Sequence, residues 1–350
     1  MNKKFQDRLD QNIPLLADGA TGTNLFEMGL QTGDSPELWN IDQPDKITNL
    51  YQSFIDAGSD IILTNTFGGT HYRLALHKAG DRVDELNQAA AKLARKCADN
   101  AERDVLVAGS MGPTGEILEP NGPVSIAQAR KAFSEQAAAL KAGGVDILWI
   151  ETISSAEEIE AAVLAAAEHE LPIVYTVSID TNGRTMMGLT AADTINCSTG
   201  LDTHITAIGT NCGVGAAEVI AAIKNLSTAA GTLDARPALV AKANCGIPEW
   251  VDGSIEYNGT PELMAEYARL AIDAGANIIG GCCGTTPAHL RSMRDAIDAH
   301  TAQSSPSLET IEAALGEVSV GAKAQLSGDL SVQGGSASGR GARKSRRKKS

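Results

Sequence analysis

The sequence contains few aromatic residues, 4% of the chain, and lacks any apolar run close to the ~20 residues that a membrane-spanning helix needs. Its first residues, "MNKKFQDRLDQNIPLL", also lack the apolar segment of a secretory signal peptide. We therefore expect a cytoplasmic protein without a membrane partner. With 350 residues and 43% hydrophobic content, the chain can bury a large core.

Basic residues are scarce outside one terminus. The chain has 29 Lys and Arg against 43 Asp and Glu, for a net charge of −14. Seven of those basic residues, and no acidic one, lie in the final segment "GRGARKSRRKKS". The rest of the chain is therefore strongly acidic, which excludes nucleic acid as an expected partner of the main body.

The composition changes after residue 301. From 302 to 350 the chain is rich in Ser, Gly and Ala and contains no aromatic residue. Only 307–317, "SLETIEAALGE", has a pattern that favours one short helix. We therefore predict a folded domain over 1–301 and an extension over 302–350, a short helix followed by a disordered basic tail. Contact of that tail with RNA or an anionic surface is the alternative to a solubilising role.

Short apolar runs recur along residues 1–301, separated by segments with helical periodicity. Glycine follows alanine where several of these helices end, as at Gly58, Gly143 and Gly275, which is typical of a helix-to-strand loop. The eight runs lie at 13–17, 60–67, 104–110, 146–153, 172–179, 205–212, 237–244 and 277–283. This pattern predicts an α/β fold, a (β/α)8 TIM-type barrel, in preference to an open doubly wound sheet.

Cysteine is also scarce, with six residues, but four of them fall at the carboxyl ends of the predicted strands, where a barrel places its active site. Without a secretory signal, free thiols or metal ligands are favoured over disulfides. Cys212, Cys282 and Cys283 would form a soft, three-thiolate site that suits tetrahedral zinc with one open position. Cys245 is a rival ligand that we expect to support the site instead.

The adjacent pair in "GGCCGTTPAHL", residues 280–290, needs irregular backbone, because neighbouring side chains on a strand point to opposite faces. The glycines around the pair can supply that geometry. Thr286 as N-cap, with Pro287 behind it, is expected to start the last helix. Buried unreactive cysteines and a strained vicinal disulfide are the alternatives.

Several motifs together resemble the zinc-dependent homocysteine S-methyltransferase family. They span residues 13 to about 300 and lie in family order. Segments 184–190 ("RTMMGLT") and 242–250 ("KANCGIPEW") are most similar to bacterial betaine–homocysteine methyltransferases. The motifs are "DGATGTNLFEMGL" (18–30), "DIILTNTFGGT" (60–70), "GPTGE" (112–116), "IET" (150–152), "GTNCG" (209–213) and "GGCCGTTPAHL" (280–290).

The resemblance implies Zn²⁺ held by Cys212, Cys282 and Cys283, and homocysteine as the methyl acceptor that becomes methionine. Asp18 and Glu151 match the family's acidic residues that hold the homocysteine amino group. The glycine turn at 18–23, which includes Gly19, offers backbone N–H groups to its carboxylate.

Two further residues, Thr66 and Asn211, are candidates either to bind substrate or to staple loops. Both stand at predicted strand ends, where a barrel gathers its active-site groups. The residues alone do not choose between the two roles.

The methyl donor is implied less directly. Glycine betaine is favoured, although Gly68 and Thr152 stand where vertebrate betaine enzymes carry tyrosines. An aromatic cage for the donor would have to be built from other residues, with Phe67, Trp39, Tyr72 and Trp250 as candidates. S-methylmethionine or another sulfonium compound is the alternative donor, and a zinc- or thiol-binding protein without turnover is the alternative class. Methyltetrahydrofolate with cobalamin is disfavoured, and no oligomeric state is predicted.

Overall fold

The computed structural model describes residues 3–180, 182–246, 248–251 and 254–332. Eight parallel strands form one sheet in the order β1-β10-β7-β6-β5-β4-β3-β2. A bridge between Ala17 and Ile61 joins the two outer strands, so the sheet closes on itself. The strands are β1 (Leu15–Leu16), β2 (Ile61–Leu63), β3 (Leu106–Met111), β4 (Ile147–Ile153), β5 (Ile173–Val177), β6 (Ala207–Cys212), β7 (Ala238–Ala243) and β10 (Ile278–Gly281). The predicted TIM-type barrel is confirmed, and each strand falls on one predicted apolar run, with β3 extending one residue beyond its run to Met111.

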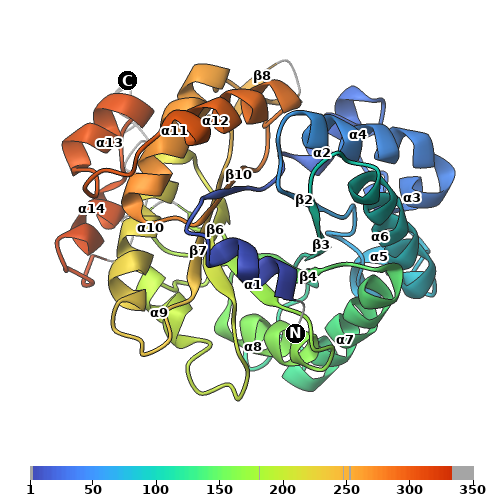
Figure 1. The fold of residues 1–350 in the computed structure, drawn as a ribbon. Coiled ribbons are helices and arrows are strands. Elements are labelled where there is room, and N and C mark those ends of the chain that lie inside the picture. The colour runs from blue at the N-terminus through green and yellow to red at the C-terminus, as the bar shows by residue number, and fades with distance from the viewer. Residues whose placement is uncertain (1–2, 181, 247, 252–253, 333–350) are drawn as a thin grey trace, which may run out of the picture.

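Helices surround the strands (Figure 1). Gly58 and Gly275 have positive φ just after α4 and α11, which confirms the predicted helix-to-strand loops there. At α7 the positive φ falls on Gly144, because the predicted Gly143 is still the last residue of the helix. The helices are α1 (Lys3–Leu9), α2 (Thr21–Glu27), η1 (Pro36–Leu38), α3 (Trp39–Asp42), α4 (Pro44–Asp56), α5 (His71–Ala75), α6 (Val83–Asp99), α7 (Ile126–Gly143), α8 (Ala156–Ala167), α9 (Ala191–Asn196), α10 (Ala216–Ala230), α11 (Pro261–Ala274) and α12 (Pro287–Ala299). Within the described ranges, no helix combines the length and apolar character needed to cross a membrane.

The amino end of the barrel is plugged. In Figure 1 helix α1 lies across the centre of the barrel, and its Phe5 is fully buried against the apolar side chains that fill the interior. Beside it, Asp60 accepts hydrogen bonds from Arg8 and Arg294 at 2.8 and 3.0 Å. Apolar side chains and ion pairs occupy the centre of this end, and in a barrel the active site is expected at the carboxyl end of the strands.

Two features were not predicted from the sequence, a β-hairpin and a second helix near the carboxyl terminus. Strands β8 (Pro248–Val251) and β9 (Ser254–Tyr257) form an antiparallel hairpin between β7 and α11. Helix α13 (Leu308–Leu315) confirms the predicted short helix, but a second helix, α14 (Val320–Leu326), follows it where a disordered tail had been expected.

The expectation of disorder was wrong for α14 because its small, buried face packs onto the barrel. Ala322 is 2% exposed, and the Gln325 side chain donates to the carbonyl of Asn182. Residues 333–350 lie outside the described residues, and the domain boundary at 301 stays a prediction.

Candidate metal centre

Three thiols meet at the carboxyl end of the barrel. Cys212 ends β6, whereas Cys282 and Cys283 directly follow β10, and their three sulfur atoms all lie within 4.8 Å of one another. Sulfur ligands of a tetrahedral zinc ion at ~2.3 Å lie about 3.8 Å apart, so small side-chain adjustments suffice to hold one. The structure thus brings together the three cysteines that the sequence singled out.

Irregular backbone turns these thiols toward one point. Cys212 has a φ of +61°, a left-handed conformation that is unusual for a residue with a side chain. Cys282 still donates its backbone N–H to Ala243 as a strand residue would, at 2.7 Å. The chain then turns at Gly284, which has a φ of +78° and lies so close to Tyr257 that a side chain would clash. The predicted role of the surrounding glycines therefore holds at Gly284.

Cys245 lies beside the cluster and is occupied elsewhere. Its thiol donates to the carbonyl of Gly259 at 3.3 Å, and its backbone N–H donates to the carbonyl of Cys283 at 2.9 Å. Both contacts fix the loops near the sulfur atoms without adding a fourth thiol. This arrangement agrees with the supporting role expected for Cys245.

Asn244 ties together the two chain segments that carry the thiols, a role that was not predicted. Its side-chain amide donates to the carbonyl of Gly213 at 2.7 Å, and its side-chain oxygen accepts from the backbone N–H of Cys283 at 3.0 Å. The residue is 2% exposed. The signal that could have pointed to it is its place directly after β7, in the segment "KANCGIPEW" (242–250).

The Asn211 side chain links β6 to the strands β4 and β5. Its side-chain oxygen accepts from the backbone N–H of Thr152 and from the hydroxyl of Thr176, at 2.9 and 2.7 Å. Its amide donates to the Thr152 hydroxyl at 2.7 Å and approaches the sulfur of Cys282 at 3.9 Å. Asn211 therefore links the strained Thr152, whose φ is +65°, to the thiol cluster.

The pKa values of the grouped thiols are raised when no metal is bound. For Cys212, a hydrogen bond from Cys282 lowers the pKa, but its interaction with Cys283 and burial outweigh that effect and raise it to about 11. The hydrogen bond with Cys212 lowers the pKa of Cys283, whereas Cys282 and burial raise it to about 12. A hydrogen bond with the phenol of Tyr257 also favours the Cys283 thiolate. A bound cation would replace the thiol protons in this cluster.

The two predicted acids both lie at the carboxyl end, in different surroundings. Asp18 is 1% exposed and forms an ion pair with Lys242, with 2.9 Å between Oδ1 and Nζ. Glu151 is 9% exposed and accepts a hydrogen bond of 2.5 Å from the Ser110 hydroxyl. Burial raises the pKa of Glu151, and the Lys242 ammonium and Ser110 partly counteract that rise. Lys242, a strand residue with a buried charge, was missed in the sequence.

The remaining predicted substrate-binding residues, Gly19, Thr66 and Phe67, have different surroundings. Gly19 lies against the loop after the cysteine pair, since a side chain there would come within 2.7 Å of the Thr285 carbonyl oxygen. The Thr66 hydroxyl donates to the Ser110 carbonyl at 2.7 Å and lies 2.6 Å from the Thr64 hydroxyl. These contacts link the loop after β2 to β3. Phe67 remains 39% exposed at the rim.

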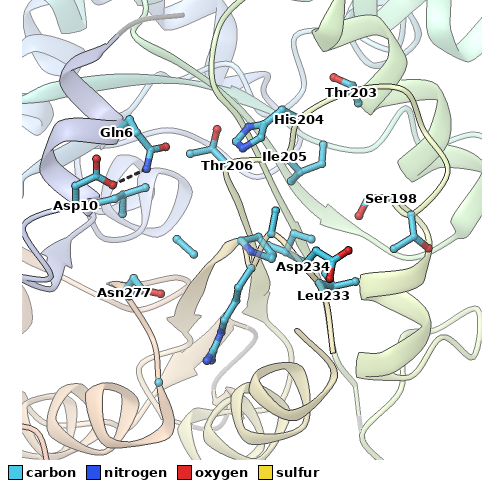
Figure 2. A pocket seen from close by; sticks show the side chains of 18 residues that line it. Gln6, Asp10, Ser198, Thr203, His204, Ile205, Thr206, Leu233, Asp234 and Asn277 are labelled. Carbon is cyan, nitrogen blue, oxygen red and sulfur yellow. Dashed lines mark hydrogen bonds between the residues drawn. The ribbon is translucent and has the colours of Figure 1, made fainter. Parts of the chain in front are cut away.

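A separate pocket opens at the opposite end of the barrel. Figure 2 shows its labelled lining, which includes Gln6 and Asp10 near α1. Thr206 and Asn277, also in this lining, immediately precede β6 and β10 in the chain. These positions are at the amino ends of the strands, whereas the thiols follow the carboxyl ends. The pocket therefore takes no part in the metal centre.

Fold and site define a (β/α)8-barrel protein with a three-thiol centre able to hold a metal ion. The chain belongs to the homocysteine S-methyltransferase family, whose model matches residues 15–297. It is similar to the methionine synthases of Mycobacterium tuberculosis and Mycobacterium leprae, with 32% identity over 309 residues and 30% over 299. These matches cover 83% and 81% of this chain but only 25% and 24% of those proteins, so the chain spans about a quarter of their length.

Solved structures resemble it over most of both chains. The metallated form of the homocysteine methyltransferase MmuM from Escherichia coli superimposes with a TM-score of 0.69 and 25% identity, over 84% of this chain and 99% of that one. The oxidized form of MmuM gives a TM-score of 0.66 at 24% identity, over 81% and 96% of the two chains, and shows the same fold.

Proposed function

We propose that the protein transfers a methyl group from a small onium compound, with glycine betaine as the first choice, to the sulfur of homocysteine, forming methionine. The observation that carries the proposal is the meeting of three thiols at the carboxyl end of the barrel in a member of this family. Small molecules in the cytoplasm, and no nucleic acid, are the partners that fit the acidic chain.

The donor set favours zinc as the metal. Three sulfur ligands, from Cys212, Cys282 and Cys283, form a soft site that selects zinc over hard cations such as magnesium or calcium. Zinc, when bound, would supply the acidity that keeps the homocysteine sulfur deprotonated at neutral pH. Asn211, Asn244 and the phenol of Tyr257 would hold the three cysteines in place.

The chain's own groups would orient the amino-acid end of homocysteine. The family resemblance assigns its ammonium group to Asp18 and Glu151, the two acids at the carboxyl end of the barrel, and the backbone of the turn at Gly19 suits its carboxylate. Transfer then forms a sulfur–carbon bond while the bond from the methyl carbon to the onium atom breaks, and its electron pair stays with the leaving group. The leaving amine or sulfide departs neutral, so the rim needs no proton donor for this step.

The donor must sit at the open face of the cluster, near its exposed aromatic groups. Phe67 is exposed at the rim and lies against Gly112, where a side chain would clash with its ring. A side chain at Gly68 would have to displace the carboxylate of Glu37, because a Cβ there would lie 2.8 Å from one of its oxygens. Phe67 and Tyr257 are therefore our candidates to face an onium methyl group.

The remaining cage candidates fit less well. Trp39 is covered by the ammonium of Lys46, 4.4 Å from its ring centre, and Tyr72 stacks against His71. The side chain of Trp250 lies outside the described residues. S-methylmethionine or another sulfonium compound remains the second candidate donor, because the tyrosines expected for betaine are replaced by Gly68 and Thr152.

Methionine formation tests the proposal directly. Zinc-loaded protein would be incubated with homocysteine and, in turn, glycine betaine, S-methylmethionine, or methyltetrahydrofolate with methylcobalamin. We expect methionine with betaine. Activity with S-methylmethionine alone would replace betaine and keep the mechanism, and activity only in the folate and cobalamin arm would overturn the onium proposal. Zinc binding with homocysteine but no turnover in any arm would indicate a binding protein.

A further inference from the structure

A buried lysine, Lys242, pairs with Asp18, one of the two acids that the family resemblance assigns to substrate. Lys242 lies on β7 with its side chain 3% exposed, and its ammonium group is 2.9 Å from Oδ1 of Asp18. Room for the lysine comes from Gly280 on the neighbouring strand, where a Cβ would lie 3.1 Å from Cγ of Lys242. The ammonium also lies over the ring of Trp149, 5.6 Å from its centre.

Both carboxylate oxygens of Asp18 are already engaged within the chain. Oδ1 pairs with Lys242, and Oδ2 accepts the backbone N–H of Leu63 at 2.7 Å. Leu63 is the last residue of β2, so Asp18 fastens the first two strands at their carboxyl ends. A carboxylate with an ion pair and a backbone donor, 1% exposed, is satisfied without a ligand.

Glu151 differs from Asp18 in that only one of its carboxylate oxygens is hydrogen-bonded within the described residues. Its Oε1 accepts the hydroxyl proton of Ser110, whereas among the described residues no hydrogen bond to its Oε2 is formed. The residue lies near the carboxyl end of β4, next to the strained Thr152, and keeps 9% of its surface exposed. One oxygen of this carboxylate is thus available for an ammonium group that enters from solvent.

We propose that the two acids have separate tasks: Lys242 neutralises Asp18 and fixes it as a positioning element, while Glu151 alone accepts the ammonium group of homocysteine. The inference rests on the proposed function and departs from the paired role implied by the family resemblance. In this chain the positive charge that faces Asp18 is the ammonium group of Lys242 and not that of the substrate.

Charge in the site supports this division. Three thiolates around a divalent cation carry a net charge of −1, so two further unpaired carboxylates would have to be buried beside a negative centre. Burial lowers the pKa of Lys242, but the carboxylates of Asp18 and Glu151 outweigh that effect and raise it. The lysine therefore stays charged and pairs with Asp18, so Glu151 is the acid left to face the ammonium group of the substrate.

The test compares Glu151→Gln with the double variant Asp18→Asn/Lys242→Met in the full-length, zinc-loaded protein. Glu151→Gln keeps an acceptor for Ser110 and removes only the charge. We expect it to retain zinc and melting temperature while homocysteine binding, measured by calorimetry, weakens on the order of tenfold to a hundredfold. The double variant removes both charges of the ion pair together, so its homocysteine binding should stay within about threefold of wild type.

Single variants complete the cycle. Lys242→Met alone leaves a buried, unpaired carboxylate at Asp18, so its melting temperature should fall, and the added Asp18→Asn change should restore it. Equal loss of homocysteine binding in Glu151→Gln and in the restored double variant would show that Asp18 touches substrate and would overturn the inference. Full binding in Glu151→Gln would overturn it as well. A wild-type protein that binds no homocysteine would instead refute the proposed function.

Discussion

Asn244 offers the sharpest test of how the metal centre is assembled, because its one side chain joins both segments that carry the thiols. Replacing it with alanine removes its hydrogen bonds to Gly213 and Cys283, of 2.7 and 3.0 Å. The carbonyl of Gly213 and the backbone N–H of Cys283 then lose their side-chain partner. Each lost bond to a partly buried group is worth about 1–2 kcal/mol, so we expect the free energy of unfolding of the metal-free protein to fall by about 2–4 kcal/mol.

In the Asn244→Ala variant, the loss of zinc affinity should exceed the loss expected from the lower free energy of unfolding. Residues that orient metal ligands typically contribute a factor of about 10–100 to affinity, and Asn244 sets the spacing between Cys212 and Cys283 through their neighbouring backbone. Competition with a chromophoric chelator would measure the affinity, and urea unfolding the stability.

Asn87→Ala is a matched control for this variant. Asn87 is fully buried on α6 and makes three side-chain hydrogen bonds, but it lies outside the loops that carry the thiols. Its amide donates to the carbonyls of Gly69 and Val83 at 2.9 and 2.7 Å, and its oxygen accepts from Gln136 at 3.2 Å. It should lose comparable stability and keep wild-type zinc affinity. Equal zinc affinities in the two variants would refute the reasoning, because the centre would then assemble without the bridge.

Three other expectations follow from the same structure. Cys245→Ala should keep one zinc per chain by metal analysis, whereas Cys212→Ala should lose it; the opposite pattern would mean that the ligands are misassigned. Deleting 319–350 should lower the melting temperature, because it removes α14 and its bonds to the barrel, while deleting 333–350 leaves every described contact in place; equal effects of the two deletions would contradict this docking. Zinc binding should tighten from about pH 6 to about pH 8, since the raised pKa values of Cys212 and Cys283 mean that uptake displaces protons; a flat pH profile of affinity would show that the thiols ionise beforehand.

The barrel and the thiols were predictable because their signals are local. Each strand appears as a short apolar run, and the cysteines stand at fixed offsets from the ends of those runs. Once eight strands close into a barrel, their carboxyl ends meet, so chain positions as distant as 212 and 282 converge without any information about contacts. Topology therefore gathers four cysteines at one end of the barrel, and the family resemblance singles out three of them as ligands.

The residues around the thiols were not predictable in this way. Lys242 reads as one polar residue in an apolar strand, and its role depends on Asp18, which lies 224 positions earlier in the sequence. Asn244 and Tyr257 likewise acquire roles only through partners on other strands or loops. Helix α14 was missed for a related reason, because its sequence is weakly apolar and its stability comes from docking on α10 and the loop at Asn182.

Backbone strain marks the place where the barrel becomes a site. Thr152 and Cys212 both have left-handed φ values, +65° and +61°, although neither is glycine, and such conformations cost about 1–3 kcal/mol each. The Asn211 side chain accepts from the backbone N–H of Thr152 and donates to its hydroxyl, and these two hydrogen bonds offset that cost on one strand. The strain at Thr152 falls directly after Glu151, where the β4–β5 register also shifts between Ile150 and Ile153. The strain at Cys212 falls on the first thiol itself. Regular strands would send successive side chains to alternate faces, so departure from strand geometry lets a carboxylate and a thiol from two strands serve the same space.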